Sequence, residues 1–218
     1  MRVAERDYVP AAPQLWLYDF LVIVLSRAPT WRRALLAQLA PREGDVIADV
    51  GCGTGTQLVK IGRAAPGLTL IGIDPDPDVL HRARRKLADA RILAGLTRGY
   101  ARDAEALLRD RAVNKVISSL VFHQVPLAEK EAGLAAMRAA LVLGGELHVA
   151  DYGLQRTPLM RKLFRIVQAG DGFANTEPNA LGVLPELMEK VGFARVCETA
   201  VIATPTGSVS LYRAERGR

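Results

Sequence analysis

Residues 46–55 read Val46-Ile47-Ala48-Asp49-Val50-Gly51-Cys52-Gly53-Thr54-Gly55, an apolar run that contains one carboxylate and ends in three alternating glycines. A helical pattern begins directly afterwards, at Gln57. The sequence therefore predicts a buried strand that leads, through a loop with few side chains, to the amino end of a helix. Such a loop allows a ligand to approach the backbone closely, and the helix terminus behind it offers unpaired N–H groups to an anion.

The spacing of the glycines narrows the choice of ligand. A dinucleotide-binding loop reads G-x-G-x-x-G, whereas Gly51, Gly53 and Gly55 form G-x-G-x-G and Thr56 follows. A phosphate-binding P-loop requires a lysine after its last glycine, and none follows here. Asp49, placed before the glycines, suits a ligand with a positively charged amino group better than it suits a pyrophosphate.

Composition and charge are those of an ordinary globular domain. The chain has 218 residues, of which 50% are hydrophobic and 24% charged, and only two cysteines, Cys52 and Cys197. This predicts one domain, no disulfide framework and a cytoplasmic location. The longest apolar run, 20–25, is too short to span a bilayer, and no signal-peptide pattern precedes it. The net charge of +6 permits attraction to nucleic acid or an anionic membrane but requires neither.

Strand and helix patterns alternate along the middle of the chain, which predicts a parallel sheet covered on both faces. The apolar runs that we expect to be strands are 46–50, 69–74, 116–122 and 146–150, and 96–101 is a less apolar candidate. Asp76 is placed to cap the second of the intervening helices and Pro77 to begin it. Another intervening helix is expected over 127–141.

The two ends of the chain depart from this alternation. Helices are expected over 15–26, 31–39, 158–169 and 184–191. Two extended runs, 195–203 and 208–214, flank a short turn and should pair antiparallel. The predicted fold class is thus α/β, a Rossmann-like doubly wound sheet of seven mostly parallel strands with a C-terminal antiparallel hairpin. Its parts are N-terminal helices (1–44), a ligand-binding core (45–151) and C-terminal helices with the strand pair (152–218).

The run from Asp49 to Gly55 resembles the first motif of class I S-adenosylmethionine-dependent methyltransferases, and the resemblance covers about Val46 to Asp151. Within that class the chain looks most like the ubiquinone/menaquinone C-methyltransferase family and related small-molecule enzymes. The stretches that carry this narrower similarity are Tyr18-Asp19, Trp31-Arg32-Arg33, Ser118 to Pro126 and Leu143 to Leu147. The chain departs from the family at Asn114-Lys115, where an aromatic-Asp pair usually opens the fourth strand.

The resemblance implies S-adenosyl-L-methionine as cofactor, S-adenosyl-L-homocysteine as product, and no metal. Ligands of open parallel sheets lie at the carboxyl ends of the strands, where the chain carries polar groups. Asp74 is expected to bind the ribose hydroxyls and Asp103 the adenine amine, although each could instead cap a helix. The complete set of expected cofactor-binding residues is Asp49, Gly51, Cys52, Gly53, Gly55, Asp74, Pro75, Asp103, Ala104, Ser119 and Leu120.

Methyl transfer requires an aligned acceptor and in some cases a base. His123, just beyond the fourth strand, is the candidate catalytic base, with shaping of the pocket or capping of the next helix as the alternative. Tyr18, Asp151 and Tyr152 are candidates for acceptor contact. The apolar helix at 15–25 and the segment 154–173 are expected to form a lid or, equally, to pack on the sheet or in a dimer. An apolar lid indicates a small hydrophobic acceptor: quinone-like, phenolic or lipid-like.

Three other functions stay open at this point. A basic stretch, comprising Arg82, Arg84, Arg85, Lys86 and Arg91, would suit an RNA methyltransferase, but such stretches are usually solvated helix faces. It lacks the interleaved aromatic residues that stack on single-stranded bases, so we expect no nucleic-acid partner. A nicotinamide-dependent oxidoreductase fits the fold but not the glycine spacing, and a non-catalytic S-adenosylmethionine-binding module fits both. The protein is expected to be a monomer or homodimer with at most peripheral membrane contact.

Overall fold

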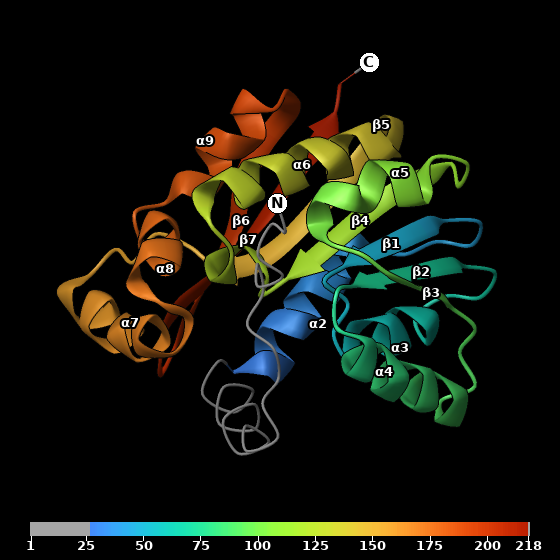
Figure 1. Ribbon diagram of the computed structural model, residues 1–218, viewed down its shortest axis with the longest axis horizontal. Helices are drawn as coiled ribbons and strands as arrows, with labels where there is room; N and C mark the ends of the chain where they lie inside the picture. Colours follow the sequence, from blue (N-terminus) through green and yellow to red (C-terminus); the bar gives the residue numbers. More distant parts are fainter. Residues whose placement is uncertain (1–26, 218) are drawn as a thin grey trace, which may run out of the picture.

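A computed structural model describes residues 27–217, which contain one seven-stranded sheet in the order β3-β2-β1-β4-β5-β7-β6 (Figure 1). Strands β1 to β5 run parallel, and β7 lies antiparallel between β5 and β6. The predicted fold class is confirmed, including the antiparallel hairpin. The helix expected over 15–26, with Tyr18, lies outside the described residues. The strands are β1 (Val46–Val50), β2 (Thr69–Asp74), β3 (Gly95–Arg98), β4 (Val113–Ser119), β5 (Leu141–Tyr152), β6 (Phe193–Thr204) and β7 (Gly207–Arg216).

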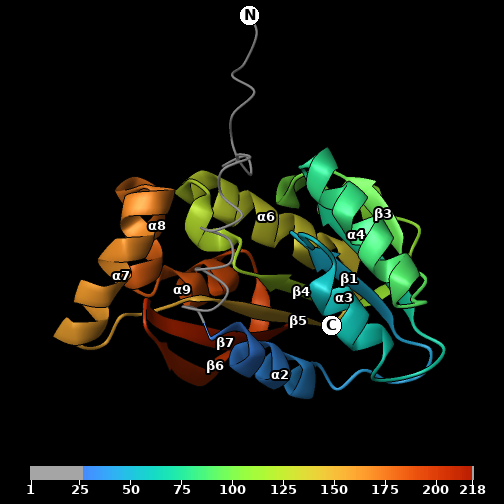
Figure 2. The same ribbon diagram turned by 90° about the horizontal axis from the view of Figure 1, so that it is seen from below.

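Helices cover both faces of the sheet (Figure 2). One face carries α2 (Ala28–Leu39), α3 (Thr56–Gly62) and α4 (Pro77–Asp89); the other carries α5 (Ala104–Leu108), α6 (Leu127–Ala140) and α9 (Val183–Lys190). Two further helices, α7 (Pro158–Asp171) and α8 (Phe173–Ala180), pack together at one margin of the molecule. Short 3-10 turns, η1 (Ala101–Asp103) and η2 (Phe122–Gln124), follow β3 and β4. No helix in the described range is both long enough and apolar enough to cross a membrane.

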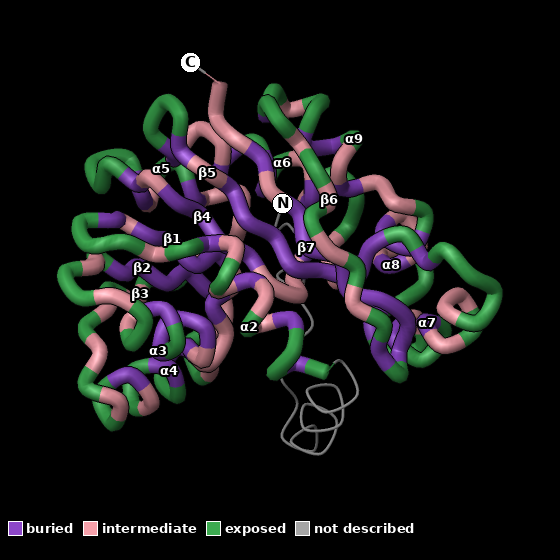
Figure 3. Tube along the Cα trace, turned by 180° about the vertical axis from the view of Figure 1, so that it is seen from behind, coloured by how far each residue is buried: buried purple, intermediate pink, exposed green. Residues whose placement is uncertain are grey.

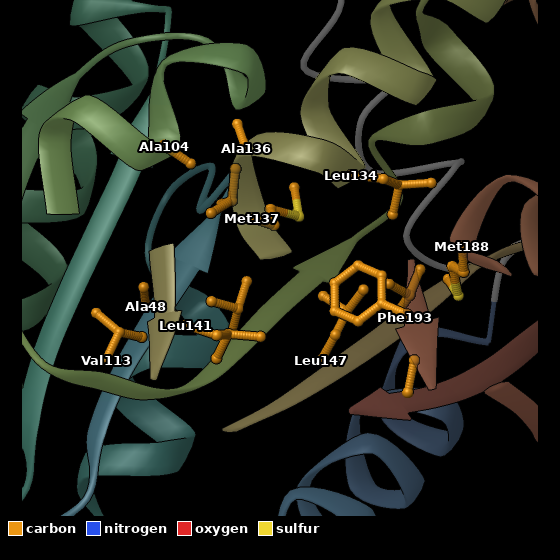
Figure 4. Close-up of a cluster of buried hydrophobic side chains, with 14 of the residues drawn as sticks. Ala48, Ala104, Val113, Leu134, Ala136, Met137, Leu141, Leu147, Met188 and Phe193 are labelled. Atoms are coloured by element: carbon orange, nitrogen blue, oxygen red, sulfur yellow. The ribbon is translucent and has the colours of Figure 1, made fainter. Parts of the chain in front are cut away.

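The central strands are mostly apolar because both of their faces are covered. Along β1 successive side chains alternate between the faces: Ile47 packs with α3 and α4, whereas Ala48 packs with α5 and α6. Figure 4 shows the second of these clusters, in which Leu134 and Met137 of α6 meet Leu147 of β5. The strands in the middle of the sheet are accordingly the most buried part of the chain (Figure 3).

The order of the strands creates a switch point between β1 and β4, because the chain leaves these neighbours toward opposite edges of the sheet. Ligands of doubly wound folds bind outside the carboxyl ends of the strands at such a point. Here the loops after β1 and β4 approach closely: a Cβ atom on Gly51 would overlap the side chain of Val121. The predicted glycine loop therefore lies at the expected ligand-binding edge.

Strand β4 begins earlier than its apolar pattern predicts because two polar residues find partners there. The Lys115 ammonium donates to Asp45 Oδ2 at 2.7 Å and to the carbonyls of Leu39 and Ala40. Asn114 donates to Asp45 Oδ1 and accepts from the Val46 N–H. Asn114 and Lys115, the two residues at which the chain departs from the family pattern, thus join β4 to the end of α2 and the start of β1. At its other end β4 stops at Ser119, before the predicted Phe122, because Leu120 has a φ of 55°.

Helix α8 was not predicted, since Pro178 lies inside it and its sequence lacks an apolar repeat. Tertiary contacts stabilise it instead: buried Asn179 donates to the Tyr152 carbonyl at 2.9 Å, and Lys130 of α6 donates to the Asn175 carbonyl at 2.9 Å. Strand β5 also extends further than the predicted 146–150, and the glycines at 144–145 lie within it rather than forming a separate turn. Both differences arise from contacts with segments distant in sequence.

The close approach at Gly51 has a measurable consequence. Gly51 and Gly144 share a φ of 77°, but a Cβ atom on Gly144 would meet nothing within 4 Å. Gly144→Ala should therefore lower the free energy of unfolding by only about 1 kcal/mol, the cost of a non-glycine residue at positive φ. Gly51→Ala should lower it by about 2–4 kcal/mol, because overpacking against Val121 adds to this cost. Urea unfolding of both variants measures the difference, and equal losses would contradict the close approach.

Candidate active site

Asp49 is the most unusual group at the ligand-binding edge. It ends the apolar part of β1, is 1% exposed, and receives no hydrogen bond at either carboxylate oxygen from any described residue. Burial raises the pKa of Asp49 to about 7; Arg32 acts in the opposite direction and Asp74 adds to the rise. A buried carboxylate without partners costs several kcal/mol of stability. This side chain is therefore suited to a ligand that brings a positive charge.

Two donors accompany this carboxylate. Gln57 lies in the first turn of α3, is 1% exposed, and its Nε2 has no hydrogen-bond partner in the described part of the chain. Arg32 of α2 lies over the Trp31 ring and donates to Gln57 Oε1 at 3.5 Å. Burial lowers the pKa of Arg32, while the charge of Asp49 raises it. An acid and two donors in one place match the ammonium and carboxylate of an α-amino acid.

The glycine loop between β1 and α3 has the backbone conformation that its sequence predicts. Gly51, Gly53 and Gly55 all have positive φ values, between 53° and 77°. Gly55 is the N-cap of α3, and no side chain caps this helix. A Cβ atom would meet nothing within 4 Å at Gly53, whereas Val121 lies against Gly51 and Ala83 against Gly55, so the backbone of this loop is open at Gly53.

Asp74, at the end of β2, holds this loop in place. Its Oδ2 accepts from the Gly53 N–H at 2.9 Å and its Oδ1 from the Asp76 N–H at 3.0 Å. Burial raises the pKa of Asp74, and these two N–H groups lower it. Asp76 caps helix α4. Asp74 therefore does not have the alternative role of capping this helix. Each Asp74 oxygen keeps a second lone pair for a ligand hydroxyl.

The remaining residues of the expected adenosine site have mixed environments. Asp103 is half-buried and accepts from the Tyr100 N–H at 2.9 Å; its side chain does not cap α5. Pro75 is half-buried beside the loop, whereas Ala104 points into the core. Ser119 and Leu120 are half-buried at the end of β4, opposite the glycine loop. The cofactor contacts of these residues stay predictions.

Cys52 lies between the glycines and is buried against Gly72. Burial raises the pKa of its thiol, and the charges of Asp49 and Asp74 raise it further. A thiol that resists ionisation is a poor nucleophile. This favours packing as the role of Cys52.

His123 lies in η2, is 3% exposed, and contacts a carboxylate with each ring nitrogen. Nδ1 is 2.7 Å from Asp151 Oδ1, and Nε2 is 3.3 Å from Asp171 Oδ2 at the end of α7. Burial lowers the pKa of His123, but the two carboxylates outweigh it and raise the pKa to about 9. The ring is therefore an imidazolium at neutral pH. A general base must be unprotonated, so this geometry favours a positioning role, and the predicted role as base awaits a kinetic test.

The two predicted acceptor residues that the structure describes contact neighbouring elements. Asp151 accepts from the N–H groups of Val121, Phe122 and Tyr152, in addition to its contact with His123. The Tyr152 hydroxyl lies 2.8 Å from Thr206 Oγ1, and its ring meets His123 edge-on. Asp151 thus holds the loop after β4, and the acceptor contacts of both residues stay predictions.

Several residues of this region were not among the predicted site residues. Asp171, Arg32 and Gln57 come from helices that the local pattern alone does not bring to the site. Lys130 of α6 is another: it donates to the carbonyls of Phe122, Val125 and Asn175 and joins the loop after β4 to α8. The basic stretch on α4 has mostly exposed side chains, apart from Lys86, which donates to Thr54 and Thr56. Among residues 27–217 no cluster of His, Cys, Asp and Glu is placed to hold a metal ion.

Comparisons with known proteins agree with this geometry. Residues 47–145 match the family model described as a methyltransferase domain. A trans-aconitate 2-methyltransferase of Afipia carboxidovorans is 45% identical over 58 residues, which are 27% of this chain and 23% of that protein. A demethylmenaquinone methyltransferase of Deinococcus radiodurans is 29% identical over 168 residues, 76% of this chain and 66% of that protein. The chain spans from about a quarter to two thirds of the length of these curated relatives.

A solved structure supports the fold. An O-methyltransferase family protein of Burkholderia thailandensis superposes with a TM-score of 0.73 at 17% identity, over 91% of this chain and 58% of that one. The sheet order, the glycine loop and the matched domain together confirm the resemblance stated above. Residues 47–145 are thus similar to a methyltransferase domain, and the fold is that of the Rossmann-like methyltransferases.

The paired His123 predicts a specific dependence of stability on pH. Because its pKa is raised from 6.5 to about 9, its contribution is complete below pH 6.5 and disappears as the pH rises through 9. The difference in the free energy of unfolding between the wild type and His123→Gln should therefore shrink by about 2–3 kcal/mol over this range. Urea unfolding at a series of pH values measures it. A difference that stays constant with pH would mean that the ring is uncharged in the fold.

Proposed function

We propose that this chain transfers the methyl group of S-adenosylmethionine to a small, apolar acceptor molecule. The observation that carries the proposal is Asp49, a buried carboxylate without hydrogen-bond partners among the described residues, at the head of a glycine loop. A ligand with an ammonium group beside an adenosine would stabilise this charge and fit the bare backbone next to it. The carboxylate, the loop and the carboxyl ends of the neighbouring strands therefore fit this cofactor.

In the proposed complex each end of the cofactor has its own group of residues. Asp49 would accept from the ammonium of the methionine part, and Gln57 and Arg32 would donate to its carboxylate. Asp74 would accept from the ribose hydroxyls and Asp103 from the adenine amine. When bound, the cofactor supplies a methyl group on a sulfonium, which is already an activated electrophile. The protein then needs only to align the acceptor with this methyl group and to exclude water.

The loop after β4 would form the wall on the acceptor side. Asp151 and Lys130 fix this loop through hydrogen bonds to its backbone, and His123 joins it to the end of α7. Because Asp151, Lys130 and His123 are already paired within the protein, this wall suits an acceptor of low polarity. The name of the Deinococcus radiodurans relative, a demethylmenaquinone methyltransferase, supports a quinone-like, phenolic or lipid-like molecule. His123 would hold the wall as a cation, with proton abstraction as the alternative role for this residue.

The proposal predicts where a labelled methyl group appears. Labelled S-adenosylmethionine, incubated with the protein and a cell extract, should place its label in molecules that partition into organic solvent. Asp74→Ala should reduce the labelling rate by about 10- to 100-fold at low cofactor concentration, because charge-assisted hydrogen bonds are lost. The matched control is Asp76→Ala, which removes the cap of α4 only two residues away and should retain activity within about twofold. Label in RNA or protein, or equal loss in both variants, would contradict the proposal.

A further inference from the structure

The outer side of α7 is apolar and exposed, which is unusual for a surface helix. Leu159 is 65% exposed and Ile166 54% exposed. At about 100° per residue, these two side chains and half-buried Leu163 lie within about 60° of one another on the helix. The buried residues Phe164 and Val167 occupy another face, packed on the core. The exposed stripe runs along a helix about 21 Å long.

Basic side chains border this stripe, and acidic ones do not. Lys162 and Arg165 are exposed, lie on one side of the stripe, and form no ion pair within residues 27–217. Arg161, further round the helix, is paired with Glu177 of α8 at 2.7 Å. The single acidic residue of α7 is Asp171, which is buried against His123. The outer face of α7 therefore combines apolar side chains with an unneutralised positive edge.

Other exposed apolar side chains lie close to α7 in the sequence. Five of the ten large hydrophobic side chains that are exposed in the described part of the chain lie between residues 154 and 181. Besides the two on α7, they are Leu154, Phe173 and Leu181, which lie just before α7 and at the two ends of α8. Helix α7 is at the margin of the molecule, remote from α3 and α4 (Figures 1 and 2). The exposed stripe of α7 therefore lies at the edge of the described part of the protein.

We propose that the outer face of α7, formed by Leu159, Leu163, Ile166, Lys162 and Arg165, docks on the surface of an anionic lipid bilayer. Helices with one apolar face and a basic border lie in the plane of the interface, with the apolar side chains among the acyl chains and the cations at the headgroups. A second copy of the chain fits this face less well, since a two-fold contact would bring Lys162 and Arg165 against their own copies. This inference concerns a surface separate from the cofactor site and does not depend on the proposed reaction.

Vesicle co-sedimentation of the full chain tests this inference. Vesicles of phosphatidylglycerol and phosphatidylcholine in equal parts should bind the wild type, and vesicles of phosphatidylcholine alone should bind it at least about tenfold more weakly. Lys162→Glu/Arg165→Glu and Leu159→Ser/Ile166→Ser should each weaken binding to the anionic vesicles by at least about tenfold. All of these substitutions are at exposed positions, so circular dichroism should show an unchanged fold.

Matched controls separate this face from a general effect of charge. Arg84→Glu/Arg85→Glu reverses two exposed charges on another helix, α4, and should leave binding within about twofold. Equal weakening by this control, or no binding by the wild type, would overturn the inference. So would sedimentation velocity showing a dimer that Leu159→Ser/Ile166→Ser dissociates, because the face would then bind a second copy. Binding of S-adenosylhomocysteine, measured by calorimetry without vesicles, should be the same in the wild type and the α7 variants.

Discussion

The buried charge of Asp49 is the constraint on which the ligand-binding edge of this protein depends. The fold places a carboxylate near the carboxyl end of β1, covers it almost completely, and supplies no hydrogen bond to it from the described residues. Such a group destabilises the folded chain unless it is protonated or paired. Its persistence in a well-packed sheet is explained if a cationic ligand completes the site. Nearby donors on Gln57 and Arg32 then serve the other charge of the same ligand.

The loops around Asp49 are held by carboxylates that accept backbone hydrogen bonds. Asp74 accepts from Gly53 of the glycine loop and from Asp76 after β2, and Asp151 accepts from Val121 and Phe122 in the loop after β4. His123 and Lys130 extend this second network to α7 and α8. Preorganised backbone of this kind is what an alignment-driven reaction requires, because methyl transfer depends on geometry more than on acid–base chemistry. The same network connects the proposed acceptor side to the helix whose outer face is apolar.

Much of this arrangement could be predicted from the sequence, because local patterns determine it. The five apolar runs of the parallel strands, the alternating glycines and the Asp76–Pro77 helix start are signals that need no tertiary information. The ends of β4 and the existence of α8 could not be predicted in this way. Lys115 is tolerated in β4 only because Asp45 and two carbonyls at the end of α2 receive it, and α8 depends on the contacts of Asn179 with β5 and of Asn175 with Lys130. The partners of His123 were missed for the same reason, since Asp171 lies 48 positions further along the chain.

Proton release during binding of S-adenosylhomocysteine tests the role of Asp49 most directly. With a pKa of about 7, Asp49 is about half protonated in the free protein at pH 7, and pairing with the ligand ammonium should ionise it. Calorimetry in buffers of different ionisation enthalpy should show release of about half a proton by the wild type and none by Asp49→Asn. Equal proton release by the two proteins, or binding by Asp49→Asn as tight as by the wild type, would contradict a buried carboxylate that awaits a cation.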